Sequence, residues 1–299
     1  MKTLVFGSVN IDHVYRLSHL VREGETISSD EYRKNEGGKG TNQAVALAKA
    51  GLEVWFAGAI GKDGQFMKDY LTSFGVNTDD LRTLDAPTGH AIIQVDEEGR
   101  NSIILYGGAN RMITPEMIGE TLSHFAAGDY VLLQNEISGG EEIIRQAAGR
   151  GMHVALNPSP VSEELLSWPL ELVEWLILNE IEGADITGLT DTEAMLDELL
   201  RRYPNCRVVL TLGEMGSVYA DGQRRVRQGI MPVDAVDTTA AGDTFTGYFL
   251  QTVLAGGSVE NALRTAAQAA SIAVSRPGAG RSIPLKDEVR SALRAEARK

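Results

Sequence analysis

Residues 237–247 read Asp237-Thr238-Thr239-Ala240-Ala241-Gly242-Asp243-Thr244-Phe245-Thr246-Gly247, a strand end followed by small residues, a carboxylate and the start of a helix. Apolar residues continue at helical spacing through Phe249 and Val253. The small side chains at 240–242 allow a ligand to approach the backbone, and the N–H groups at a helix start favour an anion. The stretch therefore predicts a strand-to-helix turn with Asp243 beside an anion site. An ordinary N-capping aspartate on a core helix is the alternative.

Strand-like and helix-like segments alternate along most of the chain, which predicts an α/β fold with a mostly parallel central sheet. The expected buried strands cover residues 3–9, 54–57, 130–134, 153–156, 175–178 and 208–212. The expected helices cover residues 43–50, 66–74, 141–150, 192–203 and 260–274.

Two segments break this alternation. Residues 90–95 and 101–106 predict a β-hairpin around an acidic turn with Gly99, and the segment from about 12 to 35 has strand character without a helical period. We therefore expect one α/β domain over residues 1–299, with a small discontinuous β-lid from about 12–35 and 88–108. Such a lid can cover a ligand site.

Composition narrows the class of protein. The chain has 299 residues and a formal net charge of −13, without a basic tract that could neutralise nucleic-acid phosphates. Cys206 is the one cysteine, so an internal disulfide is excluded and a passive buried thiol is expected. The apolar run at the N-terminus is too short for a signal peptide, and no run of eighteen apolar residues predicts a membrane span. We expect a cytoplasmic protein with no membrane or nucleic-acid partner.

Polar residues follow the predicted strands at their carboxyl ends, where ligands bind to parallel sheets. They are Asn10, Asp12, Glu136, Asn157 and Asn179, and Gly213 follows the strand expected over residues 208–212. Asn179 and Glu182 lie three residues apart and can serve a phosphate and a hydrated Mg²⁺; a helix-capping pair is the alternative.

A glycine-rich loop, residues 36–43, precedes a clear helix and offers Lys39 and Asn42 as donors to a ligand rich in hydroxyl groups. The loop lacks the spacing of a Walker P-loop, and Gln43 stands where a dinucleotide fingerprint needs its third glycine. A dehydrogenase is therefore improbable.

Together these segments resemble the PfkB carbohydrate kinase family, in its ribokinase branch. Residues 7–12 resemble the first sugar-binding motif, residues 37–44 the first signature and residues 237–245 the second. Residues 108–110, 156–160 and 179–182 follow in the expected order between the two signatures. The resemblance implies a ribokinase-like three-layer sandwich and transfer of the γ-phosphoryl of ATP to the primary hydroxyl of a pentose, foremost D-ribose. Deoxyribose, another sugar or a nucleoside are the alternative acceptors, and a non-catalytic sugar or nucleotide sensor is the alternative from another class.

The same resemblance implies a role for each matched position. Asp243 would deprotonate the acceptor, and the N–H groups of Ala241, Gly242 and Asp243 would form the catalytic anion hole. The sugar would contact Asn10, Asp12, Gly38, Lys39, Gly40, Thr41, Asn42, Glu136 and Asp243. ATP would contact Asn179, Thr211, Gly213, Gly216, Ala241 and Gly242. Glu182 would organise Mg²⁺ through water, and a monovalent cation, usually K⁺, would lie near Asp237, Thr239, Ala273, Arg276, Gly278 and Ser282. A homodimer formed through the lid sheets is implied as well.

Two positions depart from the family pattern. Ala267 stands where relatives often carry Asn or His near the adenine, which leaves open the effect of this position on adenine binding. Thr41 replaces the commoner Ala, and we expect it to narrow the sugar site or to add a hydrogen bond there.

Overall fold

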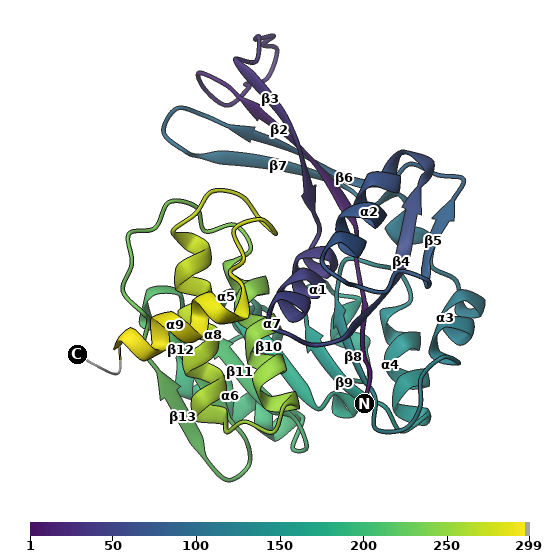
Figure 1. The fold of residues 1–299 in the computed structure, drawn as a ribbon, viewed down its shortest axis with the longest axis vertical. Coiled ribbons are helices and arrows are strands. Elements are labelled where there is room, and N and C mark those ends of the chain that lie inside the picture. The colour runs from purple at the N-terminus through teal and green to yellow at the C-terminus, as the bar shows by residue number, and fades with distance from the viewer. Residues whose placement is uncertain (297–299) are drawn as a thin grey trace.

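A nine-stranded sheet forms the middle layer of the computed structural model, which describes residues 1–296 (Figure 1). Seven strands of this sheet run parallel: β1 (Thr3–Phe6), β4 (Val54–Gly61), β5 (Leu81–Leu84), β8 (Tyr130–Gln134), β9 (His153–Asn157), β10 (Trp175–Asn179) and β11 (Arg207–Thr211). Two antiparallel strands, β12 (Ser217–Ala220) and β13 (Arg225–Gln228), complete the order β13-β12-β11-β10-β9-β8-β1-β4-β5. The predicted α/β class is confirmed.

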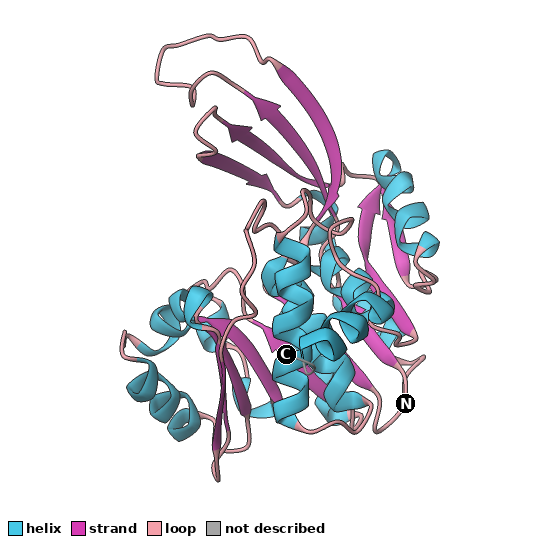
Figure 2. Cartoon of the chain, turned by 60° about the vertical axis from the view of Figure 1, so that its left-hand side comes forward, coloured by secondary structure: helices cyan, strands magenta, loops and turns pink. Residues whose placement is uncertain are grey.

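Helices cover both faces of this sheet, so its central strands read as continuous apolar runs. One face packs against α3 (Pro115–Leu122), α4 (Gly140–Gly149), α5 (Glu180–Thr187) and α6 (Thr192–Arg202). The other packs against α1 (Lys39–Lys49), α2 (Gln65–Ser73), α7 (Ala241–Leu254), α8 (Val259–Val274) and α9 (Lys286–Glu296). The expected three-layer sandwich follows, and Figure 2 shows its helices on either side of the strands.

A second sheet projects from one end of the sandwich (Figures 1 and 2). Its strands are β2 (Asn10–Arg16), β3 (Glu31–Gly37), β6 (Gly89–Val95) and β7 (Asn101–Tyr106), in the order β3-β2-β6-β7. The predicted hairpin is β6 and β7, which pair antiparallel, while β2 pairs parallel with β6. Because β2 follows β1 after three residues, the chain passes directly from the central sheet into this lid sheet.

Most predicted elements lie within one or two residues of their observed bounds. The strand expected over residues 3–9 is shorter, because β1 ends at Phe6 and Asn10 already begins β2. At the turn, Gly7 lies against α1, where an added Cβ would come within 2.7 Å of Gly40 Cα. The expected passive thiol is found in the core, since Cys206 is 3% exposed and burial raises the pKa of its thiol to about 12. Over residues 1–296, no helix has the length and apolar character needed to cross a membrane.

Candidate active site

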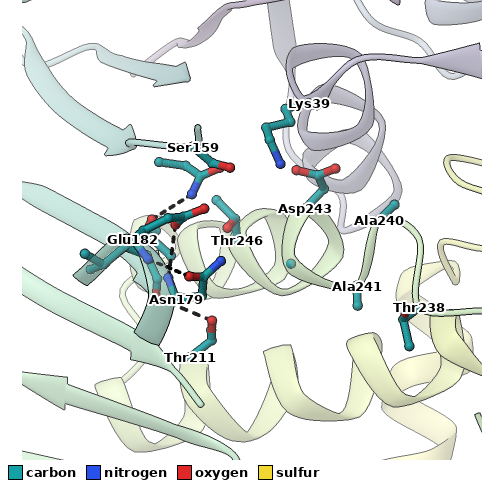
Figure 3. A pocket seen from close by; sticks show the side chains of 14 residues that line it. Lys39, Ser159, Asn179, Glu182, Thr211, Thr238, Ala240, Ala241, Asp243 and Thr246 are labelled. Atoms are coloured by element: carbon teal, nitrogen blue, oxygen red, sulfur yellow. Dashed lines mark hydrogen bonds between the residues drawn. The ribbon is translucent and has the colours of Figure 1, made fainter. Parts of the chain in front are cut away.

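A cavity of about 240 Å³ opens where the carboxyl ends of the central strands meet the first turn of α7 (Figure 3). Its walls come from α1, β9, β10, β11, α5 and α7, as expected for a ligand site in a parallel sheet. The lining residues are Lys39, Asn157, Ser159, Ile177, Leu178, Asn179, Glu182, Thr211, Thr238, Ala240, Ala241, Gly242, Asp243 and Thr246. The cavity thus collects the predicted base, the predicted anion-site residues and three of the residues assigned to nucleotide and Mg²⁺.

The start of α7 leaves backbone donors available to this cavity. Ala240 is the N-cap residue and makes no side-chain cap; its φ of 59° is the only positive value among non-glycine residues of the described chain. Such a backbone strain is retained where the surroundings demand it, often at functional sites. Ala241 N–H donates to Thr238 O at 3.2 Å, whereas within residues 1–296 the N–H groups of Gly242 and Asp243 have no acceptor. The backbone donors left for an anion in this turn are therefore those of Gly242 and Asp243 rather than that of Ala241.

Asp243 is not an N-capping residue. It lies in the first turn of α7 after the cap, and its side chain points toward α1. Asn42 Nδ2 donates to Oδ2 at 3.0 Å, and Gln43 Nε2 donates to Oδ1 at 2.9 Å. Both oxygens therefore have amide partners, and the buried carboxylate is held in one orientation (8% exposed).

Lys39 faces Asp243 across the cavity (Figure 3). Burial alone would lower the pKa of the Lys39 ammonium, but the negative charges of Asp243, Glu136 and Glu182 together raise it. The side chain is therefore a fixed positive charge, suited to hold phosphoryl oxygens between the base and the nucleotide end of the cavity.

Asn179 and Glu182 form a capping box at the start of α5, as the capping alternative expected. Glu182 N–H donates to Asn179 Oδ1 at 2.9 Å, and Asn179 N–H donates to Glu182 Oε2 at 3.1 Å. Both side chains also line the cavity, so capping and ligand binding are compatible here. The capping box uses one oxygen of the Glu182 carboxylate and leaves the other free of it.

The remaining nucleotide positions lie at different depths. Thr211 lines the cavity, and its hydroxyl donates to Leu178 O at 3.4 Å. Gly213 begins the short helix η5 (Gly213–Met215) just beyond the cavity wall. Gly216 lies outside the cavity and has a structural reason to be glycine: its φ is 90°, and an added Cβ would come within 2.1 Å of Gln228 O. Ala267 is buried in α8 and does not line the cavity.

The residues assigned to the sugar meet beneath the lid. Asn10 accepts from Asn110 Nδ2 at 2.8 Å, and Asn110 in turn bonds both backbone groups of Val9. Glu136 accepts from the Ser8 hydroxyl and from Lys39 N–H, the latter at 3.1 Å. Burial raises the pKa of Glu136 despite these donors and the Lys39 charge.

The carboxyl group of Asp12 lies in surroundings that oppose its ionisation. Burial, together with the negative charge of Glu136, raises its pKa to about 7. The carboxyl group lies so close to Gly37 that an added Cβ would come within 2.2 Å of Asp12 Oδ2. A hydroxyl-rich ligand would supply the donors that this carboxylate lacks.

The glycine-rich loop and the start of α1 pack closely against the residues that follow β1. Gly38 has a φ of 94°, and Gly40 leaves no room for a Cβ, which would come within 2.4 Å of Ser8 N. Thr41 is fully buried and its hydroxyl donates to Ser8 O at 3.2 Å. This bond joins α1 to the turn after β1, and the expectation that Thr41 shapes the sugar site stays a prediction.

The two segments assigned to the monovalent cation lie together. Asp237 Oδ1 accepts from Thr239 N–H at 2.9 Å and Oδ2 accepts from Gly278 N–H at 2.8 Å, which joins residues 237–239 to the loop after α8. Ala273 and Ser282 are buried. The Arg276 side chain turns away to Glu288, so only its backbone could face a cation. Within residues 1–296 no cluster of three His, Cys, Asp or Glu side chains is arranged to hold a metal.

Several site residues were not assigned from the sequence. Ser159, Thr238 and Thr246 line the cavity, and Asn110 fixes Asn10. Gln43 donates a hydrogen bond to Asp243, the predicted base. In the sequence analysis Gln43 served only to exclude a dinucleotide-binding motif. Its position one residue after Asn42 at the start of a helix was the available signal.

Comparison with known proteins identifies the family of the chain. Residues 2–286 match the family described as pfkB family carbohydrate kinase. A ribokinase of Haemophilus influenzae is 37% identical, with 96% of this chain and 97% of that protein covered. A deoxyribokinase of Salmonella typhi is 30% identical, with 95% and 96% covered.

Solved structures are similar over the same length. The ribokinase of Cryptococcus neoformans var. grubii serotype A in complex with ADP superposes with a TM-score of 0.87 at 36% identity, covering 98% of this chain and 99% of that one. The Arabidopsis thaliana ribokinase complexed with ribose and ATP gives a TM-score of 0.85 at 33% identity, with 98% of each chain covered.

Proposed function

Because the chain belongs to the PfkB family of carbohydrate kinases, we propose that it transfers the γ-phosphoryl of ATP to the primary hydroxyl of D-ribose, forming ribose 5-phosphate and ADP. The observation that carries the proposal is the cavity in which the Asp243 carboxylate, the Lys39 ammonium and the first N–H groups of α7 face one space. A base, a fixed positive charge and an anion site are the parts that phosphoryl transfer to an alcohol needs.

In the proposed reaction, Asp243 accepts the proton of the primary hydroxyl while the alkoxide oxygen forms a bond to the γ-phosphorus. The bond from that phosphorus to the β–γ bridging oxygen breaks, and ADP leaves. Lys39 and the N–H groups of Gly242 and Asp243 stabilise the charge on the equatorial oxygens. The lid excludes water, which would otherwise accept the phosphoryl group.

The acidic surroundings fit bound cations. Glu182 is 7% exposed and directs a carboxylate with one oxygen outside the capping box into the cavity, which suits Mg²⁺ held through water. Mg²⁺, when bound, would neutralise charge on the β- and γ-phosphates. Asp237 and the backbone of Thr239, Ala273, Arg276, Gly278 and Ser282 would hold K⁺, next to the turn that carries the anion site. ATP would contact Asn179, Thr211 and Gly213.

We propose ribose rather than a nucleoside as the acceptor because the sugar end of the site is polar. Asn10, Asp12 and Glu136 offer oxygens to hydroxyl groups, and a base would need apolar room instead. Ribose and 2-deoxyribose differ in one hydroxyl, so the acceptor has to be measured.

The test is a panel of ribose, 2-deoxyribose, other pentoses and a nucleoside, assayed by ADP release with Mg²⁺ and K⁺ present. We expect the highest kcat/KM with ribose. A nucleoside or deoxyribose used as well as ribose would overturn the choice of acceptor. If no acceptor of the panel leads to ADP release, the kinase proposal is overturned in favour of a sensor.

We also propose that two copies associate through the lid. The edge strand β7 is exposed along its whole length, with Ile103, Ile104, Leu105 and Tyr106 each about half exposed or more. An exposed apolar edge strand favours pairing with another chain. Light scattering of the protein and of Ile103→Lys should give a dimer and a monomer; a monomeric wild type would refute the interface.

A further inference from the structure

We propose that Gln43 is a positioning residue that fixes the Asp243 base to the central sheet, as part of a buried amide network with Gln134 and Asn157. The inference rests on the proposed kinase function, since it assigns a partner to the base of that reaction. Gln43 and Gln134 are fully buried, so their hydrogen bonds form away from water, where an unmade bond is costly.

The hydrogen bonds of the network fix the orientation of the Gln43 amide. Gln43 Nε2 donates to Asp243 Oδ1 at 2.9 Å and to Asn157 Oδ1 at 3.0 Å, while Gln134 Nε2 donates to Gln43 Oε1 at 2.6 Å. An ionised carboxylate can only accept, so the nitrogen of Gln43 has to face Asp243. Turning the Gln43 amide over would bring oxygen against both acceptors and nitrogen against the donor of Gln134.

The network ends on rigid elements. Gln134 and Asn157 are the last residues of β8 and β9 and are paired in register. Asn157 Nδ2 donates to Ile177 O of β10 at 2.9 Å, which fixes the Asn157 oxygen toward Gln43. Three neighbouring strands of the central sheet therefore determine where the amide of Gln43 lies.

Among the described residues, the side-chain amide of Gln134 makes no hydrogen bond other than the one to Gln43. Its Oε1 is buried and has no partner among the described residues, and its Nε2 donates to Gln43 Oε1. A buried acceptor left unpaired destabilises the fold. The orientation of Gln134 thus favours the bond that directs Gln43.

The two helices that carry Gln43 and Asp243 are in close contact. A Cβ added to Gly247 of α7 would come within 2.4 Å of Ala46 Cβ in α1. This approach brings residues 200 positions apart in the sequence within hydrogen-bond distance. Asn42 holds the second carboxylate oxygen, but it also belongs to the proposed sugar site, so a substitution there would mix two effects.

The test compares Gln43→Met with Tyr248→Phe in the full-length protein. Gln43→Met keeps the volume and removes both donors. Tyr248→Phe is the matched control, because it removes a buried 2.7 Å bond from α7 to Pro284 O without touching the base. We expect Gln43→Met to lower kcat about 10- to 100-fold, the cost of a misplaced reacting group, with KM for ATP unchanged. Tyr248→Phe should lower Tm but leave kcat unchanged.

A second variant supplies a readout that a purely structural role would not change. Gln43→Glu keeps an acceptor for Gln134 but places a carboxylate beside Asp243. Two carboxylates at that distance share one proton, so the acidic limb of the kcat–pH profile should move to higher pH. This variant decides the question if Gln43→Met does not fold.

A kcat for Gln43→Met equal to that of Tyr248→Phe, or an unmoved profile for Gln43→Glu, would overturn the positioning role. Failure of the proposed function looks different: the wild-type protein itself would then turn over no acceptor, and the inference would fall with it.

Discussion

Replacing Asp12 by Asn should make the free protein more stable at alkaline pH and, at the same time, a poorer binder of sugar. Asp12 lies on β2, and burial beside Glu136 raises the pKa of its carboxyl group from 3.8 to about 7. A raised pKa in the folded state means that ionising the carboxyl group opposes folding. The associated stability is fully present below pH about 4 and is lost as the pH rises through about 7.

The magnitude follows from the two pKa values. Between 3.8 and about 7, at 1.36 kcal/mol for each pKa unit, the free energy of unfolding falls by about 4 kcal/mol. For a chain of 299 residues the entropy of unfolding converts this to about 6 °C in Tm. Asp12→Asn has no charge to bury, so its Tm at pH 8 should exceed that of the wild type by several degrees, and the difference should vanish near pH 4.

Sugar binding should change in the opposite sense. The ionised carboxylate accepts bonds from hydroxyl groups, and hydrogen bonds to a charged group contribute about 1.5–3 kcal/mol each. We expect Asp12→Asn to raise the KM for ribose by about 10- to 100-fold. In the wild type, KM for ribose should fall as the pH rises from 6 to 8, because only the ionised form is a full acceptor.

Two assays measure these effects: thermal melts without sugar from pH 4 to 8.5, and the KM for ribose over pH 6–8.5. Asp96→Asn is the control of opposite sign. Burial alone would raise the pKa of Asp96, but the bonds from Arg100 lower it, so its removal should destabilise the protein at neutral pH. If Asp12→Asn melts no higher than the wild type at pH 8, ionisation of Asp12 does not oppose folding and its pKa is not raised.

Three further substitutions test the rest of the site. Asp243→Asn should lower kcat about 10²- to 10⁴-fold, the usual contribution of a general base, while ATP binding measured by calorimetry persists; retained turnover would remove Asp243 from the mechanism. Glu182→Gln should raise the Mg²⁺ concentration needed for half-maximal rate, because a buried negative charge facing the cavity is lost; an unchanged Mg²⁺ titration would exclude that role. Thr41→Val should lower stability by about 1 kcal/mol through the lost bond to Ser8 O and, if that bond is the only role of the side chain, leave the KM for ribose unchanged, whereas a changed KM would confirm that Thr41 shapes the sugar site.

Local patterns predicted most of the fold. The apolar runs of β8, β9 and β10 and the hairpin of β6 and β7 were placed within one or two residues. The antiparallel strands β12 and β13 were not predicted, because each has four residues, and β13, which forms the edge of the sheet, alternates between arginine and less polar residues. Such short strands are determined by pairing with a neighbour rather than by their own composition.

The site was predicted to the level of residue types at strand ends and no further. The sequence indicated that Asp243, Lys39, Asn179 and Glu182 belong together, and the cavity collects all four. It could not show that Thr41 turns inward, because that depends on how closely α1 packs on the end of β1. The position of Gln43 beside Asn42 was a signal for the site, but the sequence could not show its bond to Asp243, because that bond requires the contact of two helices distant in sequence.

The charges around the cavity explain how a chain of net charge −13 can accept a nucleotide. Asp243, Glu136 and Glu182 all act on Lys39, so three carboxylates surround one ammonium group. The free N–H groups at the start of α7 add only a partial positive charge. A triphosphate entering this space would be repelled unless cations came with it, and we propose that the Glu182 carboxylate, which lines the cavity, and the Asp237 turn hold them. We therefore expect the rate to require Mg²⁺ and a monovalent cation, because the same excess of carboxylates that supplies the proposed base also repels the triphosphate.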